Sequence, residues 1–307
     1  MDKKVIITGV TGFIGFALCK EFIKKGYIVY GIGNSSEKIR MLEDKNFYGF
    51  SIPFEKYNNI PRQIKEREFD YCFHLAHIGV SGKEKSDYQK QLMNTRIACD
   101  LVQIASKMKC RRFVFVGSVD EFEAFKKPDS SYITPTHSKI YAITKLASEQ
   151  IGKCIAENNN IEYVSALLSL TYGPGNNKNV LPNVIIKNSI QKNPIFLLDE
   201  NTQIDMIYIS DAVNALIKIA KKGKNFESYY VGHRKILTIK EIMKQISTVL
   251  CDDTLIEYGK YCDKNNTINY NQIDLDKLYK ETGFECKVDF MNGFKKTKKW
   301  IMYNDKK

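Results

Sequence analysis

A tyrosine and a lysine stand four positions apart in the run Tyr141-Ala142-Ile143-Thr144-Lys145. On a helix, positions i and i+4 share one face, so the phenol and the ammonium would point into the same space. A nearby cation favours the phenolate, so we expect Lys145 to lower the pKa of Tyr141 toward the range useful for general acid–base catalysis. This spacing is common on helix surfaces, and it gains weight only from two further features.

The first is Ser118, which follows Gly117 and the apolar run Phe113-Val114-Phe115-Val116. Such a run predicts a strand that is buried on both faces of a parallel sheet. A hydroxyl directly after it would lie at the carboxyl end of the sheet, where open α/β folds bind their ligands. Ser118, Tyr141 and Lys145 are therefore the predicted catalytic residues.

The second feature is the glycine-rich segment Gly9-Val10-Thr11-Gly12-Phe13-Ile14-Gly15, between a strand pattern at Lys3–Thr8 and a helix pattern at Phe16–Lys25. Glycine permits the tight turn, the approach of backbone N–H groups to a pyrophosphate, and close packing of helix on strand. The helix N-terminus also favours the negative charge of a phosphate. We expect this turn to bind a nucleotide cofactor.

The residues after the second predicted strand bear on the identity of that cofactor. A site for NAD usually places a carboxylate about 20 positions beyond the glycine turn, where it holds the ribose 2′-OH. Gly33 occupies this position, and the first carboxylate is Glu37. A 2′-phosphate would find polar or cationic partners in Asn34, Ser35, Ser36, Lys38 and Arg40. The predicted cofactor is NADPH, with NADH or NAD as the alternative.

Short β-branched runs that alternate with longer amphipathic stretches would position these residues. The predicted strands are Lys3–Thr8, Tyr27–Ile32, Phe47–Ile52, Asp70–Leu75, Arg112–Val116 and Tyr163–Leu168. The alternation predicts βαβ units, and hence an α/β fold with a doubly wound parallel sheet.

After about residue 170 the pattern loosens, and the remaining predicted helices lie near Leu181–Gln191, Ser210–Lys221, Thr238–Leu250 and Asp289–Met302. This second half reads as a smaller domain laid across the first. We expect residues 1–168 with about 204–231 to form the cofactor-binding domain. Residues from about 169 to 203 and from 232 to 307 would form the substrate-binding domain.

Composition excludes several classes of protein. The 307 residues are 43% hydrophobic and 27% charged, which is ordinary for a globular chain. No apolar run approaches the roughly 20 residues that span a bilayer, and Gly9 comes too early for a signal peptide, so we expect a cytoplasmic protein. The net charge is +12, but the lysines are scattered and no nucleic-acid-binding motif accompanies them, so no nucleic-acid or membrane partner is predicted.

Eight cysteines stand at positions 19, 72, 99, 110, 154, 251, 262 and 286, with no Cys-x-x-Cys pair and no histidine at ligand spacing. Several lie in apolar stretches, such as Cys72 between Tyr71 and Phe73, where a thiol behaves as a small hydrophobic group. Free thiols in a reducing compartment and no metal site are the prediction.

With these motifs in place, the sequence resembles the extended short-chain dehydrogenases/reductases, the NAD(P)-dependent epimerases, dehydratases and reductases of nucleotide sugars. The similarity rests on Thr8–Gly15, Phe73–Ala76, Asn94–Leu101, the three predicted catalytic residues, Tyr172–Pro174 and Asp205–Asp211, and so covers nearly the whole chain. It implies a Rossmann-type sheet with a smaller α/β substrate-binding domain. It also implies cofactor contacts by Leu75, Ala76, His77 and Asn94, and a homodimer formed through helices near Lys83–Lys107 and His137–Glu157.

The residues after Ser118 favour reduction within this family. Dehydratases usually carry Thr-Asp-Glu, whereas Ser118-Val119-Asp120 lacks the first carboxylate. The run from Gly117 to Phe122 is more similar to the Gly-Ser-x-x-Glu-Tyr pattern of nucleotide-sugar 4-keto reductases. The resemblance implies NADPH-dependent reduction of the 4-keto group of a nucleotide-activated 6-deoxy sugar, in polysaccharide biosynthesis. Tyr141 would supply the proton, Ser118 would bond the carbonyl oxygen, and Lys145 would anchor the ribose.

Two alternatives use the same fold. An NAD-dependent nucleotide-sugar epimerase would employ the same serine, tyrosine and lysine. A non-catalytic nucleotide- or RNA-binding relative would suit the positive charge, although the intact catalytic residues disfavour it.

The substrate side departs from the family pattern, because arginines usual in the family are replaced by Leu167 or Leu168, by Ile204 and by Lys264. Lysine offers only a point charge where arginine binds a diphosphate with two hydrogen bonds, so Lys187 or Lys192 is expected to contribute. His77 and His137 are each as compatible with a structural role as with substrate contact. The predicted substrate-binding residues are His77, Ser118, Val119, Asp120, Tyr141, Leu170, Asn179 and Lys264.

Overall fold

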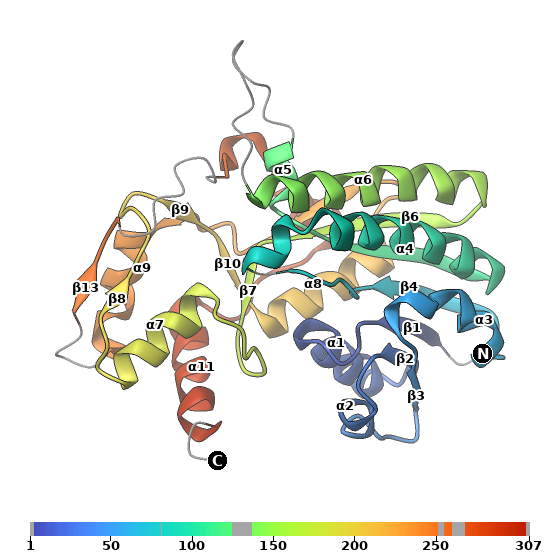
Figure 1. Cartoon of the computed structure of the whole chain (residues 1–307), viewed down its shortest axis with the longest axis horizontal. Helices are drawn as coiled ribbons and strands as arrows, with labels where there is room; N and C mark the ends of the chain where they lie inside the picture. The colour runs from blue at the N-terminus through green and yellow to red at the C-terminus, as the bar shows by residue number, and fades with distance from the viewer. Residues whose placement is uncertain (1–2, 81, 125–136, 251–254, 260–267, 305–307) are drawn as a thin grey trace, which may run out of the picture.

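A seven-stranded parallel sheet forms the centre of the molecule in the computed structural model, which describes residues 3–80, 82–124, 137–250, 255–259 and 268–304 (Figure 1). The strands are β1 (Lys4–Thr8), β2 (Ile28–Gly33), β3 (Phe47–Ser51), β4 (Phe69–His74), β5 (Cys110–Ser118), β6 (Glu162–Leu168) and β11 (Ser228–Val231). All neighbours in the order β11-β6-β5-β4-β1-β2-β3 pair in parallel. The predicted α/β fold is therefore confirmed, and each of the six predicted strands is present with shifted ends.

The strand order reverses between β1 and β4, because the chain runs outward from β1 to β3 and then returns to the other side of β1. Open α/β sheets bind ligands at such a reversal, outside the carboxyl ends of the strands. Thr8 and His74 end these two strands and are direct neighbours in the sheet. The site is thus expected above this pair.

Helices cover both faces of the sheet (Figure 1). One face carries α1 (Phe13–Lys24) and α8 (Ile209–Lys222), which share a core cluster with the buried residues Val5, Ile7 and Val164. The other face carries α4 (Tyr88–Lys107), α6 (His137–Asn158) and η1 (Phe54–Asn59), over a second cluster. Shorter helices are α2 (Ser36–Arg40), α3 (Ile60–Gln63), η2 (Gly82–Ser86) and α5 (Glu121–Ala124). Burial on both faces explains the near-continuous apolar strands.

In the described part of the second half, three two-stranded sheets and further helices are added, and most of those labelled in Figure 1 lie to the left of the large sheet. The pairs are β7 (Leu170–Tyr172) with β10 (Met206–Tyr208), β9 (Gln203–Ile204) with β12 (Leu237–Thr238), and β8 (Ile195–Phe196) with β13 (Ile256–Glu257). The helices are α7 (Leu181–Ile190), α9 (Ile239–Ile246), α10 (Lys277–Thr282) and α11 (Phe290–Asn304), with the short turns η3 (Ser247–Val249) and η4 (Tyr270–Gln272). The division into two domains stays a prediction, and α10 packs across it against α8 and β11.

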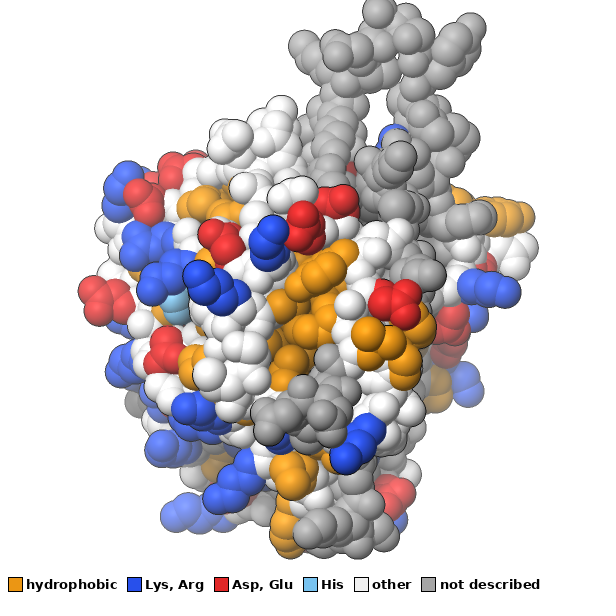
Figure 2. Space-filling view, turned by 90° about the vertical axis from the view of Figure 1, so that its left-hand side faces the viewer, with side chains coloured by type: hydrophobic (Ala, Val, Ile, Leu, Met, Phe, Trp, Pro, Cys, Tyr) orange, Lys and Arg blue, Asp and Glu red, His pale blue; other side chains and the backbone are white. Residues whose placement is uncertain are grey.

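The described residues contain no helix with the length and apolar character needed to cross a bilayer. In Figure 2, which shows the face on the left of Figure 1, basic side chains are spread among acidic and neutral ones. The six cysteines in the described part carry free thiols; Cys19, Cys72 and Cys110 are buried and Cys154 is exposed. Cys251 and Cys262 lie outside the described residues.

Candidate active site

The glycine turn brings the end of β1 against the segment that follows β4. Gly9 has a φ of +74°, and a Cβ there would lie 2.7 Å from the backbone nitrogen of Ala76. A Cβ on Gly15 would lie 2.2 Å from the carbonyl oxygen of Gly9, so α1 packs on the turn only without a side chain here. Gly12 is the N-cap of α1, and the first N–H groups of that helix have no partner within it. The turn therefore presents backbone donors at the reversal point of the sheet, and it fits a pyrophosphate.

A cleft of about 530 Å³ opens above this turn. It is lined from the turn, the end of β4, the loop after β5, helix α6 and the second half of the chain. The predicted site residues that line it are Gly9, Gly12, Phe13, Ile14, Gly15, Leu75, His77, Ser118, Val119, Asp120, Tyr141 and Leu170. The structure thus brings together the predicted cofactor turn and two of the three predicted catalytic residues.

The other predicted site residues lie elsewhere. Residues that do not line the cleft are Thr11, Asn34, Ser35, Ser36, Arg40, Ala76, Asn94, Lys145 and Asn179, while Lys264 and the side chain of His137 lie outside the described part of the chain. Ser35 caps α2 by accepting a hydrogen bond from the Lys38 N–H at 3.3 Å. Asn94 is buried and holds Ile78 through both backbone groups, at 2.8 and 3.0 Å, which is a structural role.

The side chains of Ser118 and Tyr141 both line the cleft, and the serine hydroxyl is near enough to the phenol to act on its pKa. The Asp120 N–H donates to the Ser118 oxygen at 3.2 Å and fixes the hydroxyl from the other side. Lys145 is buried, and its ammonium donates to the Val116 carbonyl oxygen at 2.9 Å. Serine and tyrosine thus face one cleft, and the lysine lies behind them.

The pKa of Tyr141 differs from the sequence-based expectation. Burial, then the charge of Asp120, raises the pKa above its ordinary value of 10, and the hydrogen bond with Ser118 only partly opposes this. The prediction that Lys145 lowers the pKa of Tyr141 is therefore wrong for this structure. Burial also lowers the pKa of Lys145 itself to about 8. Tyr141 is thus a protonated phenol at neutral pH.

A lysine that carries no sequence motif lies beside the tyrosine. Lys85, from η2, forms an ion pair with Asp120 at 2.7 Å, and its nitrogen lies 4.5 Å from the centre of the Tyr141 ring. Both members of this pair line the cleft. The pair joins positions 35 residues apart, so no local pattern in the sequence could reveal it.

His77 stands edge-on to the Tyr141 ring, with 5.4 Å between the ring centres. Its Nε2 lies 3.1 Å from the side-chain oxygen of Gln91. Burial, and then the charge of Lys145, holds the pKa of His77 well below its ordinary value. The ring is therefore neutral and helps to hold the tyrosine in place.

The cleft is also lined by Lys178, Asp205 and Tyr270 from the second half of the chain, which the sequence did not identify as binding residues. Lys178 is exposed and has no ion-pair partner among the described residues, while neither Lys187 nor Lys192 lines the cleft. Asp205 is buried and accepts the Tyr230 hydroxyl at 2.6 Å. Lys178 is therefore the free cation among these lining residues.

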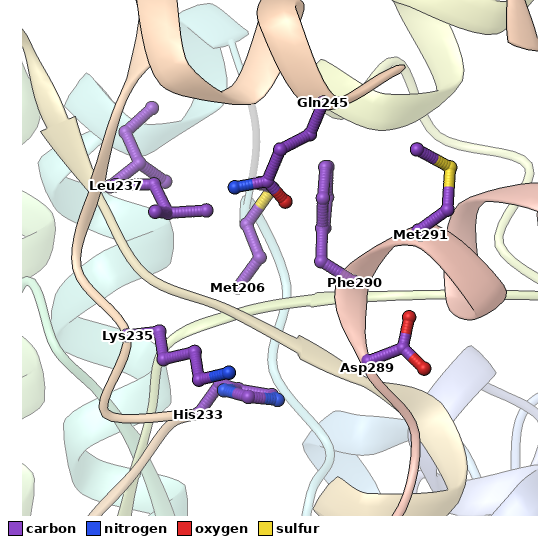
Figure 3. A pocket seen from close by; sticks show the side chains of 9 residues that line it. Met206, His233, Lys235, Leu237, Gln245, Asp289, Phe290 and Met291 are labelled. Atoms are coloured by element: carbon purple, nitrogen blue, oxygen red, sulfur yellow. The ribbon is translucent and has the colours of Figure 1, made fainter. Parts of the chain in front are cut away.

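A second cavity of about 130 Å³, drawn in Figure 3, has Ile204 among its lining residues. Figure 3 shows His233 and Lys235 close together on one wall and Asp289 with Phe290 on the opposite one. Ile204 lines both this cavity and the cleft. At the position where the resemblance leads one to expect an arginine, an apolar side chain thus lines both spaces.

Known proteins share this architecture. Over 300 residues the chain is 24% identical to CDP-abequose synthase of Salmonella typhimurium, covering 95% of this chain and 96% of that protein. It is 22% identical to dTDP-glucose 4,6-dehydratase of Haemophilus influenzae, with 98% of each chain covered. UDP-glucuronic acid 4-epimerase from Bacillus cereus, solved with UDP-glucuronic acid and NAD, superposes with a TM-score of 0.81 at 20% identity and covers 98% of this chain and 99% of its own. The model of the NAD dependent epimerase/dehydratase family matches residues 5–232, and the chain belongs to that family.

Proposed function

We propose that the protein reduces the 4-keto group of a nucleotide-activated 6-deoxy sugar with NADPH. The observation that carries this proposal is that Ser118 and Tyr141 line the same cleft as the glycine turn. Relatives named for CDP-, dTDP- and UDP-activated sugars support a nucleotide sugar as the substrate class.

The two hydroxyl groups would act on one carbonyl oxygen. When bound, NADPH supplies a hydride for C4 of the sugar. Ser118 would donate a hydrogen bond to the carbonyl oxygen and stabilise the negative charge that grows on it. Tyr141 would then give its phenolic proton to that oxygen, which suits a group whose raised pKa keeps it protonated at neutral pH.

The end of β2 supports NADPH over NADH. Gly33 ends the strand, and a Cβ there would lie 2.5 Å from the Thr11 side chain, so the turn and the strand end are in contact. The exposed residues that follow include Asn34, Ser36 and Arg40, with no carboxylate before Glu37. These residues would hold a 2′-phosphate. Tighter binding of NADH than of NADPH would count against this assignment.

Two lysines would replace the family's diphosphate-binding arginines. Lys178 is the free cation of the described cleft, and Lys85 would contribute if an anion competed with Asp120 for its ammonium.

We also propose a homodimer through α4 and α6, which pack side by side. Both helices expose large hydrophobic side chains, Tyr88 and Leu92 on α4 and Ile143 and Ile151 on α6, at 46–59% exposure. Apolar groups of this size on adjacent helices are typical of a protein–protein contact.

A screen of CDP-, dTDP-, GDP- and UDP-linked 4-keto-6-deoxy sugars for stoichiometric NADPH oxidation tests the proposed reaction. The Tyr141→Phe variant should lose at least about 100-fold in kcat, because the proton donor is removed, while its Kd for NADPH stays unchanged. Sugar interconversion without consumption of NADPH would favour the epimerase instead. RNA binding that weakens with salt, without any turnover, would favour a non-catalytic relative.

A further inference from the structure

We propose that Glu121 is a neutral positioning residue, which shares one proton with Glu149 and holds the backbone of Ser118 in place. Its effect on catalysis rests on the proposed roles of Ser118 and Tyr141, whereas its protonation does not.

The carboxyl group of Glu121 lies directly beneath the catalytic loop. Glu121 begins α5 and is 1% exposed, and its Oε1 accepts a hydrogen bond from the Ser118 N–H at 2.8 Å. A Cβ at Gly117 would lie 2.2 Å from this oxygen, so the carboxyl reaches the loop only because residue 117 has no side chain. The contact fixes the backbone at the residue whose hydroxyl faces the cleft.

The second oxygen of Glu121 has no ordinary donor. Oε2 is buried and accepts no hydrogen bond from the described residues. The carboxyl group of Glu121 hydrogen-bonds instead with that of Glu149 on α6. Since two carboxylates offer only acceptors, one of the pair must carry a proton.

The surroundings place that proton on Glu121. The Lys153 ammonium, at 2.8 Å, and the Ser228 hydroxyl both donate to Oε1 of Glu149, which stabilises its ionised form. Since these donors favour an ionised Glu149, the proton of the pair belongs to Glu121.

The other described charged and titratable groups around Glu121 form no ion pair with it, so they do not stabilise an ionised carboxylate there. Lys145, on α6, donates to the Val116 carbonyl and forms no ion pair with Glu121. Asp120 lies next in the chain and pairs with Lys85, and the buried Tyr163 hydroxyl on β6 has no partner among the described residues. Burial, followed by the charge of Glu149, holds the pKa of Glu121 well above its ordinary value, and Lys145 only opposes this.

A neutral Glu121 has a consequence for the catalytic residues. An ionised Glu121 would offset the positive charge of Lys145 and raise the pKa of Tyr141 further. As a neutral acid it keeps the hydrogen bond to Ser118 without adding a negative charge next to the proton donor.

Infrared difference spectroscopy of the whole protein, without substrate, tests the protonation directly. An ordinary glutamate, with a pKa near about 4.3, is ionised at pH 7. We expect a carbonyl band of a protonated carboxylic acid at this pH, which Glu121→Gln removes. In Glu149→Gln the new amide donates to Glu121 and favours its ionised form, so the band should disappear at a lower pH than in the unmodified protein. No band at pH 7, or a band that survives Glu121→Gln, would overturn the proposal.

Kinetics test the positioning role separately. The amide of Glu121→Gln can accept from the Ser118 N–H and donate to Glu149. The kcat of this variant should therefore stay within about threefold of the unmodified protein, a change of less than about 1 kcal/mol in activation free energy. Glu149→Gln should lower kcat and shift the pH profile, because Glu121 then ionises beside Tyr141. Thermal unfolding of both variants controls for folding. A folded Glu121→Gln variant that loses more than about tenfold in kcat would overturn the positioning role, because glutamine keeps the neutral acceptor for the Ser118 N–H.

Discussion

Replacing Lys178 with methionine is the most direct test of how the cleft binds an anionic substrate. The change removes one positive charge and keeps a side chain of similar length. Lys178 is exposed and burial still lowers its pKa, so the ammonium lies partly against protein. An exposed ion pair contributes up to about 1 kcal/mol, and a hydrogen bond between charged groups up to about 3 kcal/mol. For Lys178 we take a contribution of about 1–2 kcal/mol to the binding free energy, so its loss corresponds to a loss of about 5- to 30-fold in affinity.

Isothermal titration calorimetry with UDP, CDP, dTDP and GDP would measure this loss on the nucleoside diphosphate that binds best. Lys192→Met is the matched control, because Lys192 is also exposed and carries the same charge but does not line the cleft. The difference between the two variants should shrink as salt is added, since screening weakens an exposed pair. Equal affinities of Lys178→Met and the unmodified protein, or an equal loss in Lys192→Met, would refute the assignment of Lys178 to the diphosphate.

Three further changes test the cofactor turn, a buried carboxylate and the lysine behind the tyrosine. Gly15→Ala should weaken NADPH binding at least about tenfold, because its Cβ would lie 2.2 Å from the Gly9 carbonyl oxygen; an unchanged Kd would contradict this. Asp205→Asn should lower the free energy of unfolding by about 1–3 kcal/mol, since three hydrogen bonds lose their charged acceptor, and an unchanged urea midpoint would contradict it. Because burial lowers the pKa of Lys145 to about 8, against about 10.4 when unfolded, the unfolded state binds more protons between these values. The free energy of unfolding, relative to that of Lys145→Met, should therefore rise from pH 8 to about pH 10. A difference between the two proteins that does not change with pH would argue against the lowered pKa of Lys145.

The elements that sequence reasoning located correctly are those set by local patterns. The glycine turn, the strand before it and the helix after it need only neighbouring residues, and β1 and α1 lie there. Ser118 ends β5 as expected, because a doubly buried strand has a distinctive composition. The predicted helix begins three residues too late, since Phe13, Ile14 and Gly15 already belong to the first turn of α1.

The features that sequence reasoning missed depend on residues far apart in the chain. Lys85 meets Asp120 only because the segments after β4 and β5 lie side by side at the carboxyl end of the sheet. The pKa of Tyr141 depends on how deeply the helix is buried, and the i, i+4 spacing to Lys145 says nothing about that. Lys178, rather than Lys187 or Lys192, lines the cleft because the loop before α7, and not α7 itself, faces it.

The charge of the described cleft differs from the charge of the whole chain. The chain has a net charge of +12, yet the charged side chains that line the cleft are two lysines, Lys85 and Lys178, and two aspartates, Asp120 and Asp205. The surface excess can raise the rate at which an anion arrives, because long-range fields act on association. It cannot by itself hold a diphosphate inside a cleft whose lysine and aspartate charges balance. The proposed affinity for a substrate diphosphate would then depend on Lys178 and on any exchange of Lys85 between Asp120 and the ligand, because the backbone donors at α1 would serve the cofactor.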